Sequence, residues 1–257
     1  MSWAKLKLMS NNGSSKKITR VDKGVSSDTR SSSSQFQITP ESKSKATKYR
    51  LFAALSWFVA IACEVYAIYL LTKVPVQMTW LIVFIALDLI FVVIGSLLWK
   101  KANRLNPASE KNGFKFFVQN QLGLIIAVIA FLPIVIMVFT NKNLTGKQKG
   151  IVGAIAVVAL IVASLFGIDF NPPSIEQYAE QTEQVESLNN GVDYVYWTKS
   201  GKSYHLYSSC SYINSNRTNE IFEGTVAQAR ELKNITDLCN RCESRAAKDN
   251  EKMEKLL

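Results

Sequence analysis

The chain has 257 residues and a formal net charge of +10, with 48% hydrophobic and 19% charged residues. Residues 1–50 carry a net charge of +8, residues 51–169 carry +5 and residues 170–257 carry −3. This segregation of charge and apolar residues along the chain excludes a single soluble globule and a uniformly basic protein that coats nucleic acid.

The first segment, residues 1–50, is basic and rich in serine, with 12 serines in residues 1–48. It has too few large apolar residues to offset the entropy of ordering, so we expect a disordered tail. It also lacks the short apolar core of a secretory signal peptide. Its excess positive charge is attracted to an anionic cytoplasmic membrane surface.

The middle segment, residues 51–169, contains four long apolar windows. They cover residues 51–71, 79–99, 117–140 and 150–168. Each window is long enough to cross a hydrocarbon core of about 30 Å as a helix, and helices satisfy their own backbone hydrogen bonds in lipid. We therefore predict an all-α four-helix transmembrane bundle, joined to a small α+β zinc-binding domain at the C-terminus.

Positive charges flanking the windows predict the orientation, because Lys and Arg are retained in the cytoplasm. With the N-terminus inside, nine of these residues flank the helices on the cytoplasmic side: Lys43, Lys45, Lys48, Arg50, Lys100, Lys101, Arg104, Lys111 and Lys115. Four lie in the outer loops: Lys73, Lys142, Lys147 and Lys149. The balance predicts a multi-pass protein of the cell membrane with both termini in the cytoplasm.

Two acidic residues, Glu64 and Asp88, lie near the centres of the first two windows. A charged carboxylate at this depth is costly and is usually turned toward the bundle interior. One interpretation is a pair that handles protons or cations, as in a small transporter or channel. The other is that each carboxyl is protonated and forms a hydrogen bond across a helix interface.

The C-terminal segment is predicted to fold into a small domain. Residues 170–191 are predicted to form a linker helix that ends at an Asn-Asn-Gly sequence. Residues 192–244 have the pattern of a β-hairpin followed by a short helix, and residues 245–257 have that of a charged helix.

This segment carries the sharpest chemical pattern of the chain. His205, the only histidine, precedes Cys210 by five positions, and Cys239 and Cys242 follow as a Cys-x-x-Cys pair. Two such pairs of ligands, delivered by separate turns, suit one tetrahedral structural zinc ion. A domain of about 60 residues also needs a stabilising metal ion of this kind, because it buries little surface. The alternatives are a redox dithiol at Cys239 and Cys242, and chance clustering. The fourth cysteine, Cys63, is predicted to pack in the first membrane helix.

The run from Tyr204 to Cys210, an alanine-containing helix at residues 227–229, and the Cys-Asn-Arg-Cys motif at residues 239–242 resemble the Ada-type metal-binding module. The resemblance covers about residues 194–244 and implies that a strand and a short helix deliver the zinc ligands. In DNA-repair members of that group, the first ligand is a cysteine that accepts a methyl group. His205 takes that position here, so the resemblance implies the zinc scaffold without the repair reaction.

The composition of the domain favours binding over catalysis. Four protein ligands leave no open position for a catalytic water, so we predict no enzymatic activity; a membrane-tethered enzyme acting on nucleic acid is the weakest alternative. Tyrosines of the predicted hairpin could stack on bases, but the domain lacks the strongly basic stripe that phosphate binding requires. We therefore predict a protein partner or self-association in preference to nucleic acid.

Overall fold

The computed structural model describes residues 17–21, 38, 40–233 and 235–255. The chain divides into two compact units. One comprises Ser33–Glu180, here called the bundle, and the other comprises Met1–Ser32 with Gln181–Leu257, here called the C-terminal module.

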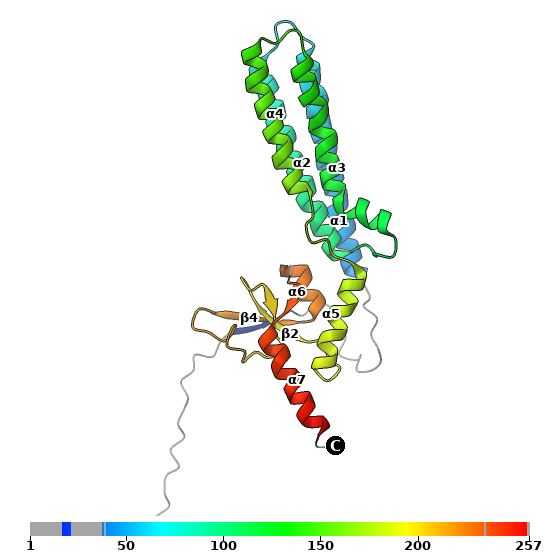
Figure 1. Cartoon of the computed structure of the whole chain (residues 1–257), viewed down its shortest axis with the longest axis vertical. Helices are drawn as coiled ribbons and strands as arrows, with labels where there is room; N and C mark the ends of the chain where they lie inside the picture. The colour runs from blue at the N-terminus through cyan, green and yellow to red at the C-terminus, as the bar shows by residue number, and fades with distance from the viewer. Residues whose placement is uncertain (1–16, 22–37, 39, 234, 256–257) are drawn as a thin grey trace, which may run out of the picture. The chain divides into compact units, whose positions relative to one another are not determined.

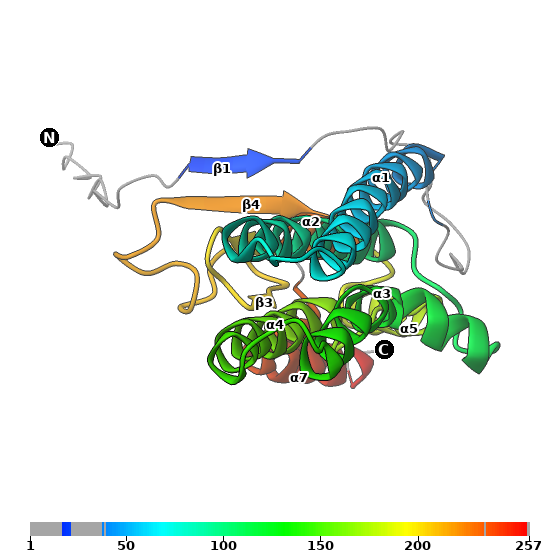
Figure 2. The ribbon, with the colours of Figure 1, turned by 90° about the horizontal axis from the view of Figure 1, so that it is seen from above.

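The bundle contains four long helices (Figure 1). They are α1 (Pro40–Leu71), α2 (Met78–Leu105), α3 (Gly113–Thr140) and α4 (Gly146–Gly167). All four are long and apolar enough to cross a membrane. Short connections make consecutive helices antiparallel, and α1 packs along α2 while α3 packs along α4 (Figure 2). The prediction of four such helices is therefore confirmed.

Small residues allow the helices to approach closely. A Cβ atom built on Gly167 of α4 would lie 2.6 Å from the backbone carbon of Gly123 in α3. Ala127 and Ala159 are also buried in the interior of the bundle. Large apolar side chains such as Phe58, which is 72% exposed, point outward instead. Such an arrangement, with small residues inside and large apolar residues outside, is typical of helices that pack in lipid.

The helices extend beyond the apolar windows that predicted them. Helix α1 begins at Pro40, inside the segment predicted to be disordered, and α2 continues to Leu105. Hydropathy marks only the part of a helix that suits lipid, and the backbone hydrogen bonds continue into its polar extensions. Lys45 and Glu41 form an i,i+4 ion pair of 2.7 Å in the extension of α1.

A polar network joins the ends of three helices. Arg50 of α1 donates to the Asn106 carbonyl at 3.0 Å, and Asn103 of α2 donates to the Gln119 carbonyl of α3 at 2.8 Å. Trp99 donates to the same carbonyl at 2.7 Å. The network therefore fixes the N-terminal part of α1 against the C-terminal end of α2 and the start of α3.

Helix α5 (Ile175–Leu188) connects the two units in sequence, because the boundary between them lies within it. Two small sheets follow. The first has the order β1-β4-β2, with β1 (Lys17–Arg20) parallel to β4 (Glu220–Gly224), and β4 antiparallel to β2 (Val195–Thr198). The second pairs β3 (Ser203–Tyr204) with β5 (Asp237–Leu238) in parallel. Helices α6 (Val226–Lys233) and α7 (Asn240–Glu254) complete the module.

The sheet corrects two expectations from the sequence. The predicted hairpin is reduced to one bridge between Tyr196 and His205, because the main partner of β2 is β4. Strand β1 comes from the segment predicted to be disordered and lies beside β4 (Figure 2). It gains order from its partner strand, which composition does not reveal. The remainder of that predicted tail, residues 1–16, 22–37 and 39, lies outside the described residues.

The core of the module lies between the three-stranded sheet and its helices. Trp197 of β2 is fully buried and stacks on Phe222 of β4, with ring centroids 6.3 Å apart. Val226 and Ala229 of α6 and Val185 of α5 are also buried in this core. The same cluster includes the three cysteines of the module, so its apolar core and its candidate metal ligands form one body.

Candidate metal centre

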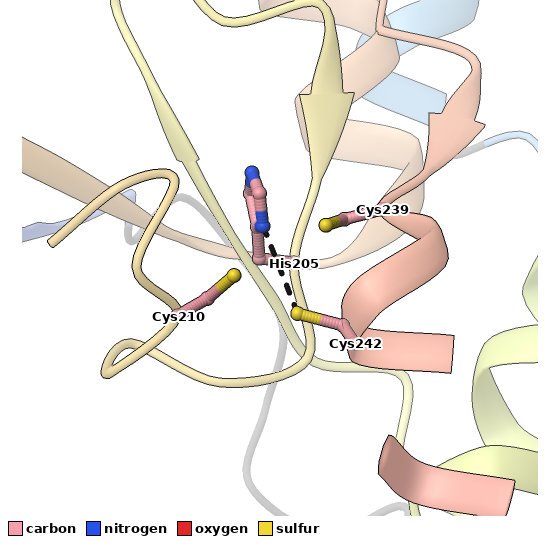
Figure 3. A group of neighbouring side chains, drawn as sticks. All are labelled: His205, Cys210, Cys239 and Cys242. Atoms are coloured by element: carbon pink, nitrogen blue, oxygen red, sulfur yellow. Dashed lines mark hydrogen bonds between the residues drawn. The ribbon is translucent and has the colours of Figure 1, made fainter. Parts of the chain in front are cut away.

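Four side chains from three parts of the module converge on one point (Figure 3). His205 follows β3, Cys210 lies in the next turn, Cys239 precedes α7 and Cys242 lies in its first turn. All four are buried, and one ligand atom of each lies within 4.8 Å of those of the others. The structure therefore brings together every metal ligand that the sequence predicts.

Backbone hydrogen bonds position the ligands. The His205 N–H and carbonyl each pair with Tyr196 at 2.7 Å, which fixes the histidine beside β2. The Cys239 N–H donates to the Tyr204 carbonyl at 2.9 Å, which places the start of α7 beside β3. A tight turn sets the third position, because the Cys210 N–H donates to the Tyr207 carbonyl at 3.1 Å.

One pair of donor atoms is spaced as in a tetrahedral zinc site, and all four donor atoms lie within 4.8 Å of one another. The Cys242 sulfur lies 3.7 Å from Nδ1 of His205. Zinc bonds of about 2.3 Å to sulfur and 2.0–2.1 Å to nitrogen, at tetrahedral angles, place neighbouring donors about 3.5–3.8 Å apart. Three soft sulfur donors with one imidazole are a donor set that selects zinc over hard, oxygen-preferring cations. The residues present therefore fit zinc.

Burial keeps His205 and Cys242 neutral before a metal binds. It lowers the pKa of His205 to about 4, so the imidazole is in the form that can bind a metal. It raises the pKa of Cys242 to about 12. Backbone N–H groups of Tyr207 and Leu206 oppose this second shift, because they bond to the Cys242 sulfur and favour its thiolate. These two donors are placed to stabilise a metal-bound thiolate.

The same geometry weakens the redox alternative. A redox pair needs an accessible thiol, whereas Cys239 is 6% exposed and Cys242 only 1%. No cysteine in the described residues forms a disulfide. The imidazole of His205 and the thiol of Cys210 lie at the same point as the pair, which a dithiol alone does not require.

Two clefts flank the four ligands, and the sequence did not predict either of them. The first has a volume of about 560 Å³ and is lined on the ligand side by His205 and Cys239, with Tyr212 and Lys202 among its other residues. The second has a volume of about 220 Å³ and lies on the side of Cys210 and Cys242. Residues of the loop that follows Cys210 line both clefts. The sequence of this loop has no regular spacing of apolar residues from which its fold could be predicted.

The two acidic residues of the bundle lie far along the chain from this site and are also buried. Glu64 of α1 is 5% exposed and Asp88 of α2 is 0% exposed. Among the described residues, no hydrogen-bond partner reaches Oε1 of Glu64 or either carboxylate oxygen of Asp88. Cys63, the remaining cysteine, is buried in α1 and takes no part in the metal centre.

No family model, curated protein or solved structure matches the chain. The resemblance to the Ada-type module is therefore not confirmed, and the compatibility with a zinc-binding module rests on the His/Cys cluster alone.

Proposed function

We propose that this is an integral membrane protein whose four-helix bundle anchors a module ordered by one structural zinc ion. His205, Cys210, Cys239 and Cys242 hold the zinc. One observation carries the proposal: four buried donor atoms lie within 4.8 Å of one another, in a donor set that closes a tetrahedral shell. A closed shell has no position for a substrate, so the zinc stabilises a binding surface and performs no reaction.

The arrangement of the helices supports an orientation with both termini in the cytoplasm. Four antiparallel helices bring the start of α1, the end of α2, the start of α3 and the end of α4 to one end of the bundle. The predicted cytoplasmic charges, including Arg50, Arg104 and Lys115, lie at those helix ends. The positive-inside rule assigns this end to the cytoplasm, where free thiols stay reduced and available to zinc.

The role of the zinc is tested by comparing Cys239→Ser with Cys63→Ser in the full chain. Both substitutions remove one buried cysteine, but only Cys239 belongs to the ligand set. We expect Cys239→Ser to abolish stoichiometric zinc binding and make residues 181–257 sensitive to protease, while Cys63→Ser retains both the zinc and the protease resistance. A Cys239→Ser protein with an intact, metal-free module contradicts the proposal.

We propose further that the module binds a protein partner or a second copy of the chain through the larger cleft. Tyr212 at this cleft is 68% exposed, and an exposed aromatic side chain beside a cleft is typical of protein interfaces. A photo-crosslinking amino acid at position 212 of the full chain should give one discrete adduct, of twice the chain mass for self-association. The same probe at Lys233, outside the cleft, is the control. Equal adducts at both positions, or adducts to lipid alone, contradict this role.

A second candidate function, the handling of protons or cations, is supported by Glu64 and Asp88. Oε1 of Glu64 and both carboxylate oxygens of Asp88 are buried without hydrogen-bond partners among the described residues, and an unpaired carboxylate in lipid requires a proton or a cation. The test is flux through the reconstituted protein. Glu64→Gln combined with Asp88→Asn keeps the shape of both side chains and should abolish cation or proton flux. Unchanged flux would contradict this function.

A further inference from the structure

Helix α7 and the residue that caps its C-terminal end, Lys255, carry a row of cations on one face. The exposed residues Arg241, Arg245, Lys248, Lys252 and Lys255 recur at intervals of three or four positions. At 3.6 residues per turn these positions fall within an arc of about 80°. The row begins beside Cys242, so the metal centre fixes one end of it.

This row borders a continuous groove. The cleft of about 220 Å³ beside the metal centre is lined by Ser209, Ser211, Arg241 and Arg245, among others. The next cleft, of about 380 Å³, shares both arginines and continues along α7 to Lys252. We call the two together the α7 groove. Sites for drug-sized ligands have volumes of roughly 300–1,000 Å³. The first cleft is smaller than this, so it suits a single small group.

Both arginines are held in place at the narrow end of the groove. Arg241 donates to the Ser211 hydroxyl at 2.9 Å, and the Arg245 guanidinium lies over the Tyr207 ring at 4.2 Å from its centroid. Planar guanidinium groups bind phosphate oxygens through paired hydrogen bonds. Two such groups fixed in advance, with Ser209 and Ser211 lining the same cleft, form a site for a phosphate group.

The acidic residues around the row leave its centre positive. Asp249 pairs with Arg245 at 3.7 Å and Glu251 pairs with Lys255 at 2.7 Å, and both pairs lie at the surface, where an exposed ion pair contributes little. Glu243 is turned toward α5, where it accepts a hydrogen bond from Gln184 at 3.0 Å. Within the described part of the chain, no carboxylate forms an ion pair with the remaining members of the row, which are Arg241, Lys248 and Lys252.

We propose that the α7 groove binds the phosphate of anionic lipid headgroups, a proposal that rests on the membrane anchoring proposed above. Only 27 residues separate the end of α4 at Gly167 from β2 at Val195, and 14 of them form α5. This short connection keeps the module at a high effective concentration near the bilayer that the bundle spans. Rows of basic residues on a helix next to a membrane bind anionic lipids in this way.

Nucleic acid fits the groove less well. Single strands are held by exposed aromatic faces as well as by cations, and Arg245 already covers the Tyr207 ring. Residues 170–257 carry a net charge of −3, so the cations of the groove stand on an acidic background. Such a background opposes a long polyanion more than it opposes one headgroup.

The test uses the full chain in nanodiscs of phosphatidylcholine, with four added probes. The probes are water-soluble dioctanoyl phosphatidic acid, dioctanoyl phosphatidylcholine, inorganic phosphate and a single-stranded DNA oligonucleotide. We expect phosphatidic acid to bind tightest, inorganic phosphate to compete weakly for the same site, and phosphatidylcholine not to bind. Arg241→Gln with Arg245→Gln should weaken phosphatidic acid binding about tenfold or more.

The matched control is Lys199→Gln with Lys233→Gln, which removes two exposed charges outside the clefts described above and should change binding less than twofold. Lys248→Gln with Lys252→Gln, two turns away from the metal centre, should weaken binding severalfold even if the arginine variant fails to fold. Equal loss in the control variant, tighter binding of the oligonucleotide, or no binding of phosphatidic acid overturns the proposal. Zinc content is measured on each sample. A chain that lacks zinc yet binds phosphatidic acid through Arg241 would contradict the structural role of zinc and leave the lipid-binding proposal intact.

Discussion

The bundle and the C-terminal module solve the problem of stability in different ways. In the bundle, small residues such as Gly123 and Gly167 bring helix backbones into contact, and large apolar side chains face outward. In the module, an aromatic core around Trp197 is continuous with four candidate metal ligands. Under the proposed function, the bundle depends on a lipid environment that accepts its exposed apolar surface, whereas the module depends on a metal that compensates for its small core.

This difference shows which part of the chain carries specific chemical groups. The charge of +10 belongs mainly to residues 1–50 and to the ends and loops of the bundle, while residues 170–257 are slightly acidic overall. Under the proposed function, the average charge reflects the orientation of the bundle in a membrane. The chemistry of the module lies in local features, namely the four ligands and the single cationic face of α7.

The largest expected effect comes from removing the metal, which should unfold the module and leave the bundle folded. Treatment of the full chain with a strong zinc chelator should unfold the module, because the apparent free energy of structural zinc binding, about 10–16 kcal/mol in small zinc domains, exceeds the stability of such a core. Protease cleavage mapped by mass spectrometry should appear within residues 181–257 and spare α1 to α4. Added zinc should reverse the effect. Simultaneous loss of both units would show that they are one cooperative body.

The next effect concerns the aromatic core of the module. Trp197→Ala should lower the free energy of unfolding of the module by about 3–5 kcal/mol, because Trp197 is fully buried and stacks on Phe222. The measurement is zinc-saturated denaturant unfolding of the full chain. Trp80→Ala in α2, where the ring is 56% exposed, is the matched control and should leave the module unchanged. Tolerance of Trp197→Ala would mean that the metal alone holds the module.

A smaller effect is expected in the bundle. Gly167→Ala places a methyl group 2.6–2.7 Å from the backbone of Gly123 and Leu124, so α3 and α4 must separate. Overpacking of this kind costs about 1–3 kcal/mol, which thermal unfolding in detergent would detect. Gly150→Ala, where nothing lies within 4 Å, is the control and should be neutral or slightly stabilising. Zinc content should stay the same in both variants, and a loss of zinc in Gly167→Ala would contradict the separation of the units.

The smallest effect tests the contribution of the N-terminal strand. Val21→Pro removes the hydrogen bond from the Val21 N–H to the Glu223 carbonyl, which measures 3.0 Å. We expect a loss of about 1 kcal/mol, since β1 is an exposed edge strand whose Ile18 is 50% exposed. Amide exchange in β4 should increase while zinc stays bound. Unchanged exchange in β4 would show that β1 adds nothing to the module.

Much of the architecture could be predicted because its causes are local. A run of apolar residues identifies each bundle helix, and the spacing of His205, Cys210, Cys239 and Cys242 predicted the cluster that the structure contains. Helix α5 (Ile175–Leu188) follows two prolines and ends at Asn189-Asn190-Gly191, as the sequence indicates. Asn190 and Gly191 have the positive φ angles that such a helix end requires.

The features that could not be predicted depend on partners distant in the chain. Strand β4 has few apolar residues, and it becomes a central strand only because β1 and β2 pair with it on both sides. The parallel pairing of β1 with β4 joins residues about 200 positions apart, and no local period signals it. The α7 groove likewise requires Arg241 and Arg245 to meet a loop from another part of the module.

The central claim is that one zinc ion orders a module tethered to a membrane on its cytoplasmic side. The most direct measurement is metal analysis of the purified full chain, combined with thiol labelling in sealed membranes before and after chelation. We predict one zinc per chain, with Cys210, Cys239 and Cys242 protected until chelation and then labelled only from the cytoplasmic side. A chain without stoichiometric zinc whose module stays folded, or thiols labelled from the outer side, would contradict the account.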